Sequence, residues 1–259
     1  MKAEAHLPND LSLLLCGKPT PVSASSSELD EILAHIRESM DYLMGQLFWL
    51  GSQEVRHISM LGPFFGRSLL ELGTTALIGR LDPLRLLVVR KIQAQGNYKT
   101  GIAWKASIRW TGDVIAEKKA TTLWSETLDY KDVSRALLGE YYDQLLWRPA
   151  AQEMLAAVKE QGAWLADLAA FNMDFFISRK RDEIGRLYSS LSKGIHHEFV
   201  MPPGVLYDRN TVVNLILSTV RQVAELGLVS HFIAQASSTL SPEEALAAFN
   251  RIETVEVIK

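Results

Sequence analysis

Cysteine is almost absent from this chain, since Cys16 is the single one among 259 residues. One thiol can form neither an internal disulfide nor a zinc site built from several thiolates, and such scarcity is typical of reducing compartments. We therefore expect a cytoplasmic protein. An excess of charge of one sign is lacking as well, because the formal net charge is only −3. This balance excludes a wholly basic, histone-like protein, so any contact with nucleic acid must come from a local patch.

Long uninterrupted apolar runs are also missing. The most apolar stretch, 61–81, has about the length of a bilayer span but is broken by Gly62-Pro63, Arg67 and Glu71. We expect it to be a buried core helix, and we expect no membrane contact. The apolar segment 11–16 superficially resembles a lipoprotein signal, but it is too short and lacks a basic region before it, so we interpret it as part of a cytosolic arm.

Alternation of period two, the mark of half-buried strands, is scarce, whereas apolar residues recur every three or four positions nearly everywhere. The pattern predicts an all-α fold, an antiparallel helical bundle of long helices that forms a single domain over 26–259, preceded by a polar N-terminal arm over 1–25. The predicted helices span 28–50, 53–81 with a bend at Gly62-Pro63, 82–95, 99–115, 132–146, 150–160, 164–188 and 210–236, followed by a short one that opens at Ser241-Pro242.

Acidic residues are missing between Leu84 and Gly112, whereas cations recur there and alternate with Tyr98, Trp104 and Trp110. Cations for phosphates and aromatic faces for bases are what single-stranded nucleic acid requires. Two interpretations stay open, an RNA-binding surface and a solvated helix face over core tryptophans. The residues predicted to contact nucleic acid are Arg85, Lys91, Lys99 and Lys105.

Two further sets of charges need partners or solvent. Arg67 and Glu71 stand four residues apart inside the most apolar helix, where an unpaired charge would be costly, so we predict that they pair with each other or across the bundle. The run 179–181, Arg-Lys-Arg, is typical of a solvated turn.

A polar stripe is predicted along the helix face that begins at Arg186, because residues three or four apart share one side of a helix. Hydroxyls, a cation and an imidazole would line up on that side. Neighbouring histidines at 196 and 197 would point about 100° apart, and no His-Glu-x-x-His pattern is present, so we expect no metal site and no cofactor. The residues predicted to bind a ligand or partner are Arg186, Ser192, Lys193, His196 and His197.

The segment Tyr188-x-x-Leu191-Ser192-x-x-x-His196 resembles the late-helix element of HEPN domains, small all-α bundles of prokaryotic toxin, defence and RNA-processing systems. It is similar to the pattern of some divergent, non-nuclease branches. Active HEPN ribonucleases carry an arginine, four to six residues and then a histidine, and they dimerise so that two such motifs face each other. Here Arg186 and His196 have nine residues between them. The resemblance therefore extends to His196, with Arg186 or Lys193 as substitutes for the family's cation.

Two functions follow from this resemblance. The first is a HEPN-like interaction protein, an accessory component of a defence or toxin-antitoxin-type system, that contacts RNA, a nucleotide or an effector protein and works as a homodimer. The second is a metal-independent ribonuclease in which His196 is the general acid or base and Lys193 or Arg186 stabilises the phosphate. The missing arginine spacing favours the first. A structural bundle that assembles with an ATPase or another effector stays open as a third interpretation.

Overall fold

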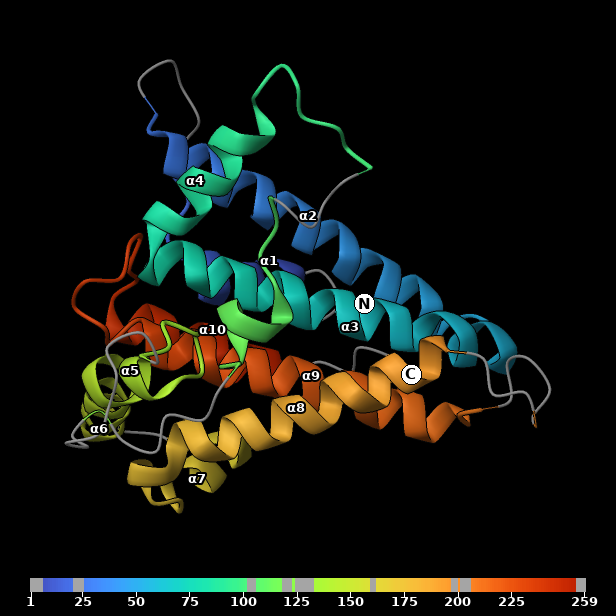
Figure 1. Ribbon diagram of the computed structural model, residues 1–259. Coiled ribbons are helices and arrows are strands. Elements are labelled where there is room, and N and C mark those ends of the chain that lie inside the picture. The colour runs from blue at the N-terminus through green and yellow to red at the C-terminus, as the bar shows by residue number, and fades with distance from the viewer. Residues whose placement is uncertain are drawn as a thin grey trace.

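The fold is all-α, as the sequence predicts (Figure 1). The computed structural model describes residues 7–20, 26–101, 106–117, 123, 133–158, 162–196, 200 and 206–254. Of these residues 74% are helical, and they contain no strand.

The helix α3, Val55–Leu81, is the central element of the bundle (Figure 1). It forms an antiparallel hairpin with α2, Glu28–Gly51, whose first turn is closed by a capping box between Ser27 and Asp30. The other side of α3 contacts α8, Phe176–Ile195, and α9, Arg209–Ser230. The stretch 61–81 is thus a core helix, as predicted.

Small residues allow the helices to approach α3 closely. A Cβ atom on Gly62 would lie 2.2 Å from Val212 Cγ1 of α9, and one on Gly66 would lie 2.9 Å from Leu191 Cδ2 of α8. Both distances are shorter than real Cβ contacts. At Gly62 the neighbour is the short, branched Val212, so only glycine fits there, whereas at Gly66 the end of the Leu191 side chain would have to shift. The predicted bend at Gly62-Pro63 does not end the helix, because α3 continues through Pro63. The proline ring packs against Gly194 of α8.

The predicted polar N-terminal arm is wrong for residues 7–16. This segment forms α1, Leu7–Cys16, and the side chains of Leu11, Leu14, Leu15 and Cys16 are fully buried. They contact α2, α9 and α10, Pro242–Glu253, so α1 belongs to the bundle. Burial raises the pKa of the Cys16 thiol to about 12, which makes it an inert core side chain.

The predicted helix over 99–115 is wrong within the described residues. Residues 98–99 and 106–109 are not helical, and Trp110–Val114 forms a single wide turn in which Gly112 has φ +101°. A side-chain oxygen of Asp113 accepts a hydrogen bond from the Arg109 backbone N–H at 2.8 Å, which closes this turn locally.

The remaining helices differ from the prediction mainly in their bounds. The segment 132–160 contains α5, Glu140–Tyr142, a wide turn, and α6, Arg148–Ala157, which follow one another without the predicted gap at Pro149. The long helix predicted over 164–188 is two helices, α7, Ala163–Ala169, and α8. The helix predicted over 82–95 is α4, Pro83–Gln93.

Candidate functional site

The predicted polar stripe lies on the solvent-exposed face of α8. Arg186 and Lys193 are exposed within the helix, and His196 is exposed at the C-cap position. Their spacing continues a regular exposed row that starts before the helix. We call this row the α8 stripe, and its members are Phe175, Arg179, Asp182, Arg186, Ser189, Lys193 and His196.

Two residues of the HEPN-like segment have structural roles instead. Leu191 is fully buried and packs on Gly66 of α3. Tyr188 stacks on Trp110 with ring centroids 4.0 Å apart and planes 10° apart, and its hydroxyl accepts a 2.6 Å hydrogen bond from Arg67 Nη2. Burial raises the pKa of Tyr188, so its hydroxyl stays protonated at neutral pH. These contacts fix the rotation of α8 and thereby direct the stripe outward.

The hydroxyls of this helix face are used within the helix. Ser189 Oγ donates to the Gly185 carbonyl at 2.9 Å, and Ser192 Oγ donates to the Tyr188 carbonyl at 2.7 Å. Ser192 is half-buried and is not part of the exposed row. If Ser192 contacts a ligand, its hydroxyl can therefore only accept a hydrogen bond.

Arg186 and Lys193, the two cations that could act together with His196, lie at different distances from it along α8. Arg186 is ten residues before His196, which is about 15 Å along a helix, whereas Lys193 is three residues before it, about one turn. One phosphate can therefore reach Lys193 and His196 together but not Arg186 and His196 within one chain. His197 lies outside the described residues.

The cations of the acid-free segment do not share one surface. Arg85 is turned inward, where its guanidinium contacts Asp82 at 2.9 Å and Asp113 at 3.3 Å. Lys91 pairs with Glu28 at the start of α2, at 2.5 Å. Lys99 is exposed outside any helix, and Lys105 lies outside the described residues. Acidic residues outside the segment, Asp82 and Asp113 at its two ends and Glu28 on α2, thus pair with Arg85 and Lys91. RNA binding there stays a prediction.

The predicted ion pair between Arg67 and Glu71 is confirmed, with Arg67 Nε 3.0 Å from a Glu71 carboxylate oxygen. The predicted solvated turn at 179–181 is wrong, because the run lies in α8 and Lys180 is 2% exposed. Lys180 Nζ pairs with the buried carboxylate of Glu225 on α9. Burial lowers the pKa of Lys180, and the contact with Glu225 opposes this effect.

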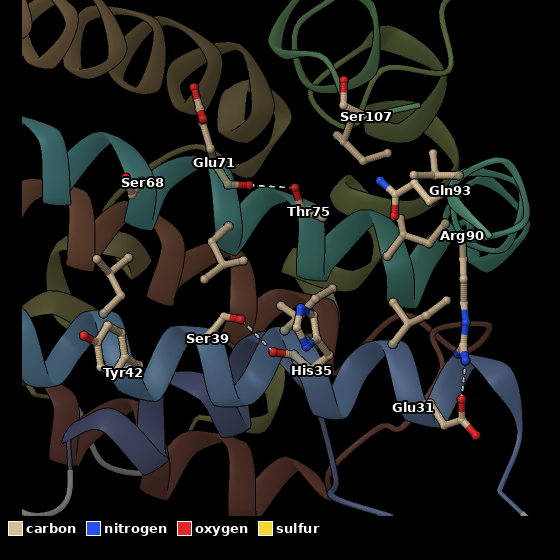
Figure 2. Close-up of a pocket in the computed structure, with 17 residues that line it drawn as sticks. Glu31, His35, Ser39, Tyr42, Ser68, Glu71, Thr75, Arg90, Gln93 and Ser107 are labelled. Carbon is tan, nitrogen blue, oxygen red and sulfur yellow. Dashed lines mark hydrogen bonds and ion pairs between the residues drawn. The ribbon is translucent and has the colours of Figure 1, made fainter. Parts of the chain in front are cut away.

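One feature that the sequence did not indicate is a groove of about 910 Å³ between α2, α3 and α4 (Figure 2). Residues 107–108 close one side of it. Seven aliphatic and ten polar residues line it, and both kinds come from all three helices. A pocket between packed helices depends on contacts between residues far apart in the sequence, so no local sequence pattern predicts it.

Within the described ranges, no three His, Cys, Asp or Glu side chains come together as a metal ion would require. In the same part of the chain, α9 is long and apolar enough to cross a bilayer, but 67% of that stretch is buried in the bundle. Such burial is usual for the core helix of a folded domain.

No family model, no curated protein and no solved structure matches this chain.

Proposed function

We propose that the protein is a HEPN-like interaction protein that binds RNA through the α8 stripe. The family assignment rests on the resemblance of the segment from Tyr188 to His196. Within that assignment, we propose an accessory role in a prokaryotic defence or toxin-antitoxin-type system, in which the protein works as a homodimer or beside an effector protein.

The observation that carries the RNA proposal is the spacing of the exposed cations in the stripe. Arg179, Arg186 and Lys193 follow one another at intervals of seven residues, so they lie about 10 Å apart along one side of the helix. The stripe contains a single acid, Asp182. Arg179 is partly neutralised by Glu183 at 2.7 Å. A polyanion with phosphates at intervals shorter than 10 Å can contact all three cations at once, whereas a single small anion cannot.

Recognition is favoured over catalysis because of the distances along α8. Only Lys193 lies close enough to His196 to act on the same phosphate, and the active family members use an arginine at closer spacing than Arg186 has here. Lys193 next to His196 keeps ribonuclease activity as the second candidate. The two functions differ in what happens to the RNA, and one experiment separates them.

The test measures binding of a fluorescently labelled single-stranded RNA by anisotropy across a range of potassium chloride concentrations. Three phosphate contacts predict a slope of about −2 in log K against log salt, or about a 20-fold loss of affinity between 50 and 200 mM. Arg186→Gln and Lys193→Gln should each reduce that slope by about 0.7. Lys99→Gln, an exposed lysine of the acid-free segment, is the matched control and should leave it unchanged.

Two outcomes would overturn the proposal. If Arg186→Gln and Lys193→Gln bind like the wild type while Lys99→Gln is weakened, the acid-free segment is the RNA surface instead. If the purified protein cleaves the RNA and His196→Ala abolishes cleavage, the protein is a ribonuclease.

A further inference from the structure

We infer that the groove between α2, α3 and α4 binds an uncharged amphipathic small molecule, with an apolar body and hydrogen-bond donors. This site is separate from the α8 stripe. Its volume of about 910 Å³ lies in the range of small-molecule pockets, which is about 300–1,000 Å³.

The aliphatic walls provide the affinity for an apolar body. Five side chains from α2, α3, α4 and the 107–108 segment are only half-buried, so the groove leaves part of their apolar surface accessible. A ligand that covers this surface gains the hydrophobic free energy that the fold itself leaves unused. These residues are Ile32, Leu43, Leu72, Val89 and Ile108.

The charges of the groove are already paired, which argues against a charged ligand. Glu31 of α2 contacts Arg90 of α4 across one end (Figure 2), and Glu71 pairs with Arg67 on α3. Each pair is internally neutral. A ligand carboxylate or ammonium would have to separate one of them or leave its own charge partly desolvated without a partner. An uncharged ligand has neither cost.

The hydroxyls of the groove specify the polar part of the ligand. Ser39 donates to the His35 carbonyl at 2.9 Å, Ser68 to the Phe64 carbonyl at 2.9 Å, and Thr75 to the Glu71 carbonyl at 2.8 Å. Figure 2 shows the first and the last of these hydrogen bonds on the facing helices. Because the protons of these three hydroxyls are already used, their oxygens offer lone pairs, which match the donors of an alcohol or amide.

Gln93 adds to this preference from α4. Its Nε2 donates to the Ala106 carbonyl at 2.8 Å, which fixes the amide and leaves Oε1 as an acceptor. The ligand that fits best therefore carries several donors at one end and an alkyl or aryl body at the other.

The test uses n-octyl-β-D-glucoside below its micellar concentration as the probe, because it joins an octyl chain to an uncharged polyhydroxyl group. Calorimetry should show saturable binding to the wild type. Octyl sulfate and octyltrimethylammonium have the same chain with opposite charges, and we expect each to bind at least tenfold more weakly. Equal or tighter binding of either charged probe would contradict the argument from paired charges.

Two variants place an aromatic ring in the groove from opposite walls, Ser39→Phe on α2 and Thr75→Phe on α3. Each should weaken octyl glucoside binding at least tenfold. Ser189→Phe on α8 is the matched control, because Ser189 is exposed and makes the same hydrogen bond to a carbonyl one turn earlier. Circular dichroism identifies a variant that fails to fold, and the other variant then decides the outcome.

The proposal is overturned if the folded groove variants bind the probe like the wild type. It is also overturned if they change the oligomeric state in light scattering and leave probe binding unchanged, since the groove would then be an interface between protein chains. RNA binding should be unaffected in Ser39→Phe and Thr75→Phe, so a failure here is distinguishable from a failure of the RNA proposal.

Discussion

The buried pair formed by Arg80 and His231 predicts a specific loss of stability in mild acid. His231 is 4% exposed, and both ring nitrogens are engaged. The Leu240 backbone N–H donates to Nδ1 at 3.1 Å, and Nε2 lies 3.0 Å from the Leu14 carbonyl. Nδ1 is therefore an acceptor, and the single proton of the neutral ring is on Nε2.

Protonation of Nδ1 would break the hydrogen bond from Leu240 and bring a second positive charge beside Arg80, whose Nη2 is 3.1 Å away. Burial, with the charge of Arg80 as a second cause, lowers the pKa of His231 from 6.5 to about 3. Arg80 is itself fully buried and its pKa is lowered by burial to about 10, so it stays charged at neutral pH.

The sign of the effect follows from these values. Below pH 6.5 the unfolded chain takes up a proton at this histidine and the folded protein does not, so stability falls as the pH decreases toward 3. Between pH 7.5 and 5 the expected loss in the free energy of unfolding is about 2 kcal/mol.

Urea unfolding at both pH values measures this loss in the wild type and in His231→Gln, whose amide can accept from Leu240 and donate to Leu14. The variant should lose about 2 kcal/mol less than the wild type between the two pH values. His57→Gln, at an exposed position, should keep the wild-type dependence. Equal losses in wild type and His231→Gln would refute the assignment of a buried neutral imidazole.

Two further predictions concern the core. Glu225→Gln leaves the buried Lys180 without its main counter-charge and should lower the free energy of unfolding by about 3–5 kcal/mol, whereas the added change Lys180→Met should restore a large part of it. Leu14→Ala should cost about 3–5 kcal/mol in urea unfolding, because α1 is a core helix. A cost below about 1 kcal/mol would instead indicate an arm that contributes little to the fold.

The helices with long apolar stripes were predictable from the sequence, because a period of 3.6 is a local property. The prediction of 28–50 agrees with α2, Glu28–Gly51, and Ser241-Pro242 does open α10 through a capping box. The segment 99–115 failed because its aromatic and small residues fit a helical spacing, while Gly112 and Asp113 favour a local turn. The helical spacing and the turn preference conflict, and the sequence pattern alone does not show which of the two is stronger.

The error about α1 has a different cause, which is contact at long range, and such contacts also pair the cations of the acid-free segment. α1 is held by the Leu14 carbonyl, which accepts from Arg80 at 3.2 Å across 66 residues of sequence. Arg85 meets Asp113 across 28 residues. A segment that has no acidic residues in the sequence can still lie next to acidic side chains from other segments in the folded protein. The stripe on α8 was predictable as a helix face, but the groove was not, because three separate helices form it.

The two candidate sites are joined through side chains of α3, and this connection decides which variants can tell them apart. Glu71 lines the groove and pairs with Arg67, and Arg67 in turn donates to Tyr188 of α8. Tyr188 lies one turn before Ser192, so its contacts help to set the orientation of the stripe. A substitution at Glu71 or Arg67 would perturb both sites. The side chains of Ser39 in the groove and Arg186 in the stripe donate to backbone carbonyls outside this chain of contacts, and Thr75 touches it only through the Glu71 carbonyl. Variants at such positions assign an effect to one site.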